Sequence, residues 1–278
     1  MPYFTHDDMR FHYQRSGEGA EFVFSHGLGA NLERVAEFVE ELPGMRVTVY
    51  DNRGHGRTAP VPDAEHLNFT VMAGDVAALL DHLGVQSAIV GGVSMGSGIA
   101  VRFALDYPER VRALILSRPA WLDRPNPENL AFAPLLAPAL ETGDRARALE
   151  ILSASRYYET LVEQDPVAAA LLPEIVQLNE PGTLAACYRG IVGSAPVSSL
   201  KEMRQLRMPT LVLGCDEDAF HPMEIARLWA ETIQGARLVE ICPRSVDAVR
   251  HVSDFRRAAT EFLETVLGPG HFRGSRRA

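Results

Sequence analysis

The sequence predicts one α/β domain built on a mostly parallel, doubly wound sheet. Short apolar runs rich in valine and isoleucine recur along the chain, and segments with helical periodicity separate them. Runs this short and apolar are typical of strands buried on both faces, and their alternation with helices favours parallel pairing. A chain of 278 residues is long enough for one large domain or for a core domain that carries an insertion.

The predicted core elements follow from the short apolar runs and from the segments with helical periodicity. We expect strands at residues 22–24, 47–50, 88–90, 114–116, 210–213 and 238–241, and helices at residues 32–42, 71–83, 95–105, 225–233 and 255–267.

The alternation stops between residues 121 and 206, where proline, alanine and leucine dominate and no strand is indicated. We expect this segment to form a helical lid over a pocket, inserted between core segments 1–120 and 207–268. Within the lid, residues 144–161 are predicted to form one continuous helix with Asp144 as its N-cap.

Composition restricts the partners of the protein. Apolar residues make up 46% of the chain and charged residues 23%, and the net charge is −9. Such an acidic chain is unsuited to nucleic acid and favours a small-molecule partner. With no signal-peptide pattern and no apolar stretch of membrane-spanning length, we expect a cytoplasmic protein without a membrane partner. Whether it forms a homo-oligomer is left open, and residues 269–278 are expected to be a flexible tail.

Three cysteines, Cys187, Cys215 and Cys242, lack the spacing of a metal or redox site and are interpreted as buried thiols. The sequence therefore predicts neither a metal nor a cofactor.

The most informative motif is Gly92-Val93-Ser94-Met95-Gly96, which joins a predicted strand to a predicted helix. A G-x-S-x-G sequence in this context forms a sharp turn that presents the serine at the carboxyl edge of the sheet. The glycines allow the neighbouring strand and helix to approach the turn closely. Ser94 is therefore the candidate nucleophile.

With this motif, the chain resembles the α/β-hydrolase superfamily over nearly its whole length. The segment His26-Gly27-Leu28-Gly29 is similar to the family's HG-x-G loop. The resemblance implies an α/β-hydrolase fold in which the backbone amides of Leu28 and Met95 form the oxyanion hole.

The segment 51–58, DNRGHGRT, looks like the D-x-R-G-x-G-x-S segment of the same family. In the family this segment packs behind the nucleophile, so Asp51 and His55 are interpreted as scaffold rather than as catalysts. His26 is interpreted in the same way, because the family's order is serine, acid, histidine.

The resemblance places the acid of the triad after the strand TLVLG, where the chain reads CDEDAFHP. We favour Asp218 over Asp216, because Asp218 lies four residues before Pro222. The alternative is that these carboxylates form a solvated acidic turn.

The histidine of the triad is where the chain departs from its family. Family spacing leads to Ser245 or Val246, and the nearest histidine downstream is His251. If the last helix begins after Ser253 as N-cap, His251 ends a loop that can fold back to Ser94 as the general base. This is the geometry that we expect.

A helix that begins earlier, after Ser245 or Asp247, gives a different result. His251 then joins a buried stripe with Phe255, Ala258 and Phe262 and points away from Ser94. Two further alternatives are another histidine as the base and no base at all.

Together these residues predict a serine hydrolase that cleaves an ester, lactone, thioester or C–C bond of a small, partly apolar carbonyl compound. The alternative is a non-hydrolytic relative with an incomplete triad that acts as a small-molecule binder, lyase or cyclase. Candidate pocket residues near the lid are Arg118, Trp121, Phe132, Tyr157, Tyr158 and His221.

Overall fold

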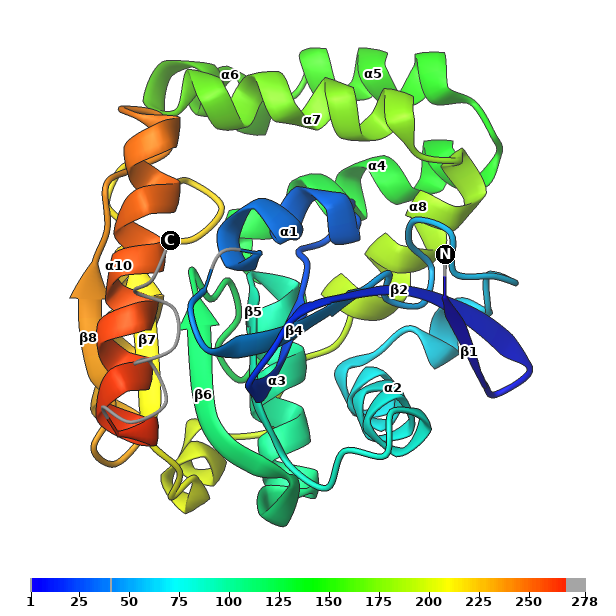
Figure 1. Cartoon of the computed structure of the whole chain (residues 1–278). Coiled ribbons are helices and arrows are strands. Elements are labelled where there is room, and N and C mark those ends of the chain that lie inside the picture. The colour runs from blue at the N-terminus through cyan, green and yellow to red at the C-terminus, as the bar shows by residue number, and fades with distance from the viewer. Residues whose placement is uncertain (1, 41, 269–278) are drawn as a thin grey trace.

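A computed structural model describes residues 2–40 and 42–268, so the expected tail at 269–278 lies outside the described residues. Figure 1 shows a twisted sheet with helices on both faces and a group of helices above it. The eight described strands are β1 (Tyr3–His6), β2 (Met9–Gly17), β3 (Ala20–Ser25), β4 (Met45–Tyr50), β5 (Ala88–Val93), β6 (Val111–Ser117), β7 (Thr210–Gly214) and β8 (Arg237–Glu240).

The strand order is β1-β2-β4-β3-β5-β6-β7-β8, and every pair from β4 to β8 is parallel. This confirms the predicted fold class and all six predicted strands. The antiparallel strands β1 and β2 at one end were not predicted from the sequence. Strand β2 ends in exposed polar residues, so it lacks the continuous apolar run that marked the other strands.

The two faces of the sheet are covered by different helices, because successive strand residues point to opposite sides. Phe22 and Phe24 of β3 belong to one apolar core together with α1 (Leu32–Val39) and α10 (Ala248–Leu267). Val23 belongs to the other core, with α2 (Phe69–His82), α3 (Met95–Asp106) and α9 (Met223–Thr232). Within the described ranges, none of the helices has the length and apolar character needed to span a membrane.

The insertion between β6 and β7 is helical, as expected. Its helices are α4 (Phe132–Glu141), α5 (Arg145–Ser153), α6 (Arg156–Gln164), α7 (Pro166–Leu178) and α8 (Pro181–Cys187). Helices α5, α6 and α7 form the outermost layer in Figure 1. We call residues 121–206 the lid.

One prediction within the lid is wrong, since residues 144–161 do not form a continuous helix. Asp144 does cap α5, accepting a hydrogen bond from the backbone of Arg147. The chain then turns at Ala154, and the Ser155 side chain caps α6 by accepting a hydrogen bond from Tyr158 N. A serine that caps a new helix competes with continuation of the old one.

We expect hydrogen exchange in α5 and α6 to be faster than in β5 and β6. Only Ala148 and Leu152 of α5, and Leu161 of α6, are buried, whereas every residue of β5 is buried. Segments with few buried apolar contacts open locally at low free-energy cost. Exchange measured by mass spectrometry checks this, and protection in α5 and α6 equal to that in β5 would contradict a mobile lid.

Candidate active site

Ser94 lies in a strained turn between β5 and α3. Its backbone has φ 56° and ψ −114°, in the left-handed half of conformational space that non-glycine residues rarely occupy. A side chain on Gly92 would overlap the backbone of Gly96, and one on Gly96 would overlap the backbone of Ser25. The glycines of the motif are therefore required by close packing, and this is the geometry of a nucleophile elbow.

The His26–Gly29 loop lies directly against this serine. A Cβ atom added to Gly27 would be 3.4 Å from Ser94 Cβ and 4.0 Å from Ser94 Oγ. Leu28 lines the same cavity as Ser94, and Met95 begins α3, where backbone amides lack partners within the helix. This placement agrees with the expected role of both amides, which remains a prediction.

Two buried histidines brace the loop. His26 Nδ1 donates to Gly27 O at 2.8 Å, and its Nε2 accepts from Asn52 N at 3.0 Å. His55 Nε2 accepts from Gly29 N at 3.1 Å. Burial lowers the pKa of His26, and burial together with the nearby His26 lowers the pKa of His55 to about 3. Both rings are neutral and serve as scaffold.

Asp51 is also a scaffold residue, as interpreted from the sequence. Its carboxylate accepts hydrogen bonds from Leu32 N at 2.9 Å, from Arg57 N at 2.9 Å and from His12 Nδ1 at 2.8 Å. These bonds join the start of α1, the 51–58 segment and β2 behind the elbow.

Of the two candidate acids, Asp218 is the one that lies at the cavity. Asp216 is exposed. The Asp218 side chain is only 12% exposed, and it accepts hydrogen bonds from a histidine and an arginine. Its Oδ1 atom accepts from His221 Nδ1 at 2.8 Å, and its Oδ2 atom accepts from Arg118 Nη1 at 3.1 Å. Burial by itself would raise the pKa of Asp218, but His221 and Arg118 outweigh it and hold that pKa well below its ordinary value.

Arg118 follows β6 in a left-handed conformation with φ 47°. Its backbone amide donates to Leu213 O at 2.7 Å, while the preceding Ser117 O accepts from Ser94 N at 3.0 Å. The sheet edge thus fixes Arg118 beside the elbow, and its side chain holds Asp218 from the sheet side.

The expected loop geometry of His251 is wrong. Helix α10 begins at Ala248, with Asp247 as the N-cap accepting from Arg250 N at 2.9 Å, rather than after Ser253. His251 is therefore one turn inside the helix. Its Nδ1 donates to Cys242 O at 2.7 Å instead of facing a carboxylate.

His251 is a packed side chain in the described structure. It is fully buried, and its ring meets Phe38 edge-on with centroids 5.8 Å apart, while Phe38 and Phe255 pack at 5.3 Å. Burial and the positive charges of Arg118 and Arg244 lower the pKa of His251 to about 4. His251 is also outside the set of described residues that line the Ser94 cavity. The expected Asp218–His251 pairing is thus replaced by Asp218–His221.

Stability should fall on acidification because of His251. The folded protein keeps this ring neutral to about pH 4, whereas a histidine in the unfolded chain has its ordinary pKa of 6.5, so protons favour the unfolded chain between these values. The free energy of unfolding should fall by about 1.4 kcal/mol per pH unit for each such histidine in this window. Urea denaturation from pH 7 to pH 4.5 measures this slope. His251→Asn should reduce it, and an unchanged slope would contradict a neutral buried His251.

One cavity of about 580 Å³ contains Ser94, Arg118, Asp218 and His221. Trp121 and Phe132 also line it, as expected of pocket residues. From the sequence, His221 was predicted only as a weak substrate-binding residue. The sequence feature that could have indicated its pairing with Asp218 is the D-x-x-H-P spacing, which lets His221 Nδ1 turn back onto the Asp218 carboxylate.

Two expected pocket residues are not in this cavity. Tyr157 Oη donates to Asn129 O at 3.0 Å, and both Tyr157 and Tyr158 are half-buried against the apolar core beneath the lid. Their prediction as substrate contacts is wrong, because the first turn of α6 directs them to packing inside the lid.

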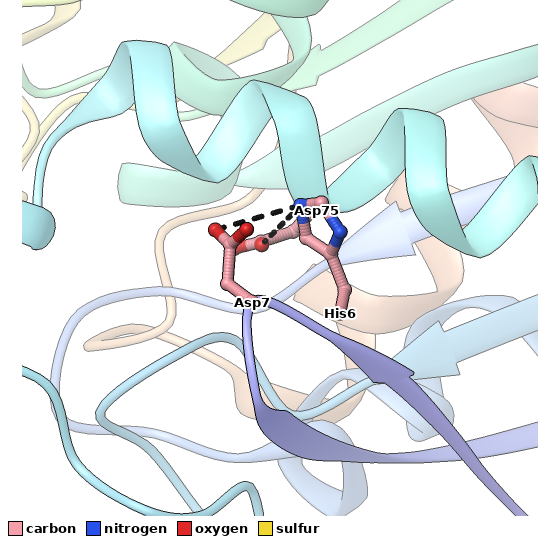
Figure 2. A group of neighbouring side chains, drawn as sticks. All are labelled: His6, Asp7 and Asp75. Atoms are coloured by element: carbon pink, nitrogen blue, oxygen red, sulfur yellow. Dashed lines mark ion pairs between the residues drawn. The ribbon is translucent and has the colours of Figure 1, made fainter.

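Figure 2 shows a second group of polar side chains, His6, Asp7 and Asp75. His6 Nε2 is 3.6 Å from Asp7 Oδ2 and 3.9 Å from Asp75 Oδ1. Arg53 donates to both carboxylates, with Nη2 at 3.1 Å from Asp7 and Nε at 2.6 Å from Asp75. The buried guanidinium already supplies the positive charge that a metal ion would bring, so this group joins β1 to α2 as a structural ion pair.

The sequence of residues 22–243 matches the family model described as the alpha/beta hydrolase fold. The chain belongs to this family. Its sequence is 29% identical over 278 residues to the 2-hydroxy-6-oxo-6-phenylhexa-2,4-dienoate hydrolase of Comamonas testosteroni, covering 92% of each chain.

Solved structures of α/β-hydrolases superpose on most of the chain. A thermophilic esterase from Thermogutta terrifontis matches with a TM-score of 0.74 and 26% identity, covering 93% of this chain and 94% of the esterase. The enol-lactonase of Burkholderia xenovorans matches with a TM-score of 0.75 at 23% identity, covering 94% and 99% of the two chains. The protein is an enzyme, a hydrolase of the α/β-hydrolase family.

Proposed function

We propose that this α/β-hydrolase is a serine hydrolase that cleaves an ester, lactone, thioester or C–C bond of a small, partly apolar carbonyl compound. The observation that carries the proposal is the cavity that Ser94 shares with the hydrogen-bonded Asp218–His221 pair. A serine hydroxyl becomes an effective nucleophile only when a base accepts its proton. Within the described chain, His221 is the histidine that lines this cavity.

Pairing with Asp218 fixes which ring nitrogen of His221 we propose as the general base. Asp218 is ionised and only accepts hydrogen bonds, so His221 Nδ1 carries the proton that it donates to Asp218. In the neutral ring this leaves the lone pair on Nε2, which is the atom that accepts the proton of Ser94. Asp218 also stabilises the imidazolium that forms, and Arg118 holds Asp218 in place.

The reaction proceeds through an acyl-enzyme. Ser94 Oγ attacks the carbonyl carbon while His221 Nε2 takes the hydroxyl proton, and the Leu28 and Met95 amides bind the oxyanion. His221 then gives the proton to the leaving group as the bond to the carbonyl carbon breaks. Water, deprotonated by His221, attacks the acyl-Ser94 ester, and His221 returns this proton to Ser94 Oγ as the acid is released.

The walls of the cavity indicate the kind of acyl group. Trp121, Phe132, Leu171 and Ile175 contribute apolar side chains from the lid. A pocket of this size and character accommodates a small molecule whose larger part is apolar. The relative from Comamonas testosteroni, whose name specifies a phenyl-substituted dienoate, is in keeping with such a substrate.

Labelling with a fluorophosphonate tests the proposal without knowledge of the substrate. We expect rapid covalent modification at Ser94, located by peptide mass spectrometry, because the activated oxygen attacks phosphorus as it attacks a carbonyl carbon. A silent Ser94 in folded protein would refute the serine hydrolase and favour the non-hydrolytic alternative. Protein that is first denatured by heat and then treated with the same fluorophosphonate serves as the control for nonspecific labelling of surface groups.

A further inference from the structure

Two lid residues hold the segment that carries Asp218 and His221. We call residues 215–221 the acid loop. Asp165 Oδ2 accepts a hydrogen bond from Ala219 N at 3.1 Å, and Asn129 Nδ2 donates to Phe220 O at 2.6 Å. Ala219 and Phe220 are the two residues between Asp218 and His221, so both bonds act directly on the backbone that links this pair.

Asp165 does more than begin a helix. It is the N-cap of α7, where its Oδ1 atom accepts from Ala168 N at 2.9 Å, and its other oxygen reaches the acid loop. The residue is only 6% exposed, and within the described residues its carboxylate forms no ion pair with an arginine, lysine or histidine. Burying a carboxylate without a cation is costly unless backbone amides satisfy it. Capping alone would need neither this burial nor the second bond.

Asn129 forms the second link from the lid. Its side chain also donates to Ala120 O at 3.1 Å, and its own carbonyl accepts from Tyr157 Oη at 3.0 Å. Next to it, the rings of Phe132 and Phe220 pack with centroids 5.3 Å apart. The acid loop is therefore fixed from the lid side by residues of three lid segments, and from the sheet side by Arg118 on Asp218.

We propose that Asp165 and Asn129 are positioning residues through which closure of the lid assembles the Asp218–His221 pair. The inference rests on the proposed function, because it concerns the base of that reaction. When α7 moves away to admit substrate, the Ala219 amide loses its partner and the acid loop loosens. When the lid returns, the same bonds fix His221 toward Ser94. Misplacement of a catalytic group by about 1 Å can cost about 100-fold in rate.

The chain offers a matched pair of variants. Asp144 is also an aspartate N-cap of a lid helix, but its bond to Arg147 N stays within α5. Serine caps a helix well but is too short to hold two separate segments, so Asp165→Ser keeps the cap of α7 and removes the link to Ala219. Asp144→Ser makes the same chemical change without touching the acid loop.

The measurements are kcat and KM on p-nitrophenyl butyrate, the rate of fluorophosphonate labelling, and hydrogen exchange of residues 215–221. For Asp165→Ser we expect kcat and the labelling rate to fall on the order of 10- to 100-fold. KM should change less than about threefold, because the variant displaces the base and not the side chains that contact the substrate. Exchange in the acid loop should rise. Asp144→Ser should stay within about twofold of the parent in all of these.

Other outcomes overturn the inference. Equal losses of kcat in both variants would indicate a general loosening of the lid. A rise in KM alone would indicate that Asp165 contacts the substrate. The inference also fails if Asp165→Ser has the kinetics of the parent protein. If Asp165→Ser does not fold, Asn129→Asp replaces it, because a carboxylate cannot donate to Phe220 O. Parent protein that neither turns over the ester nor labels refutes the proposed function as well, whereas an active parent with an unaffected Asp165→Ser refutes this inference alone.

Discussion

Ser94→Ala is expected to lower kcat/KM on short acyl esters by at least about four orders of magnitude while leaving the fold intact. The change removes only the oxygen that forms the acyl-enzyme, and alanine fits the space because the elbow is shaped by Gly92 and Gly96. Ester hydrolysis, together with the melting temperature, checks both parts of this prediction.

Ser97 provides the control for this variant. It is one helical turn from Ser94 and fully buried, and its single hydroxyl proton is shared between Gly92 O at 2.8 Å and Ser117 O at 2.9 Å. Ser97→Ala should therefore cost about 1 kcal/mol in stability and largely preserve turnover per folded molecule. A Ser94→Ala enzyme that retains full turnover would rule out the acyl-enzyme.

His221→Ala is expected to lower kcat by about three to four orders of magnitude, because it removes the base while the nucleophile and oxyanion amides remain. His221 is partly buried at the cavity wall, so the loss of stability should be small. Steady-state kinetics and urea denaturation of the same preparation separate the two effects.

His251→Asn is the matched control and should behave in the opposite way. An asparagine amide can still donate toward Cys242 O, but the contact with Phe38 is lost, so we expect a loss of about 1–3 kcal/mol in stability. Turnover per folded molecule should be largely kept. The reverse pattern, in which His251→Asn is inactive and His221→Ala is active, would exclude His221 as the base.

The parts of the site that could be predicted are those fixed by local backbone geometry. The strand, the G-x-S-x-G turn and the helix after it are contiguous, so the position of Ser94 follows from the sequence alone. The same holds for the His26–Gly29 loop, which directly follows β3.

The position of His251 could not be predicted, because it depends on where α10 begins. Both Asp247 and Ser253 are good N-cap residues, and local propensity does not choose between them. The choice is made by packing of His251 and Phe255 against Phe38, which is more than 200 residues away along the chain, counted from the residue numbers. Pairing of Asp218 with His221 likewise depends on the conformation of the acid loop, which lid contacts help to determine.

The neutral histidines behind the His26–Gly29 loop have a consequence for how this enzyme responds to acid. His26 and His55 accept backbone hydrogen bonds through Nε2, and protonation of either ring would turn that acceptor into a donor facing another donor. Because burial keeps the pKa of both rings low, to about 3 for His55, the acceptors persist through mildly acidic conditions. The low pKa values of these rings thus favour an unchanged shape of the His26–Gly29 loop under mildly acidic conditions. Once the loss of stability caused by His251 is accounted for, a decline of turnover per folded molecule in that range has its origin outside the His26–Gly29 loop.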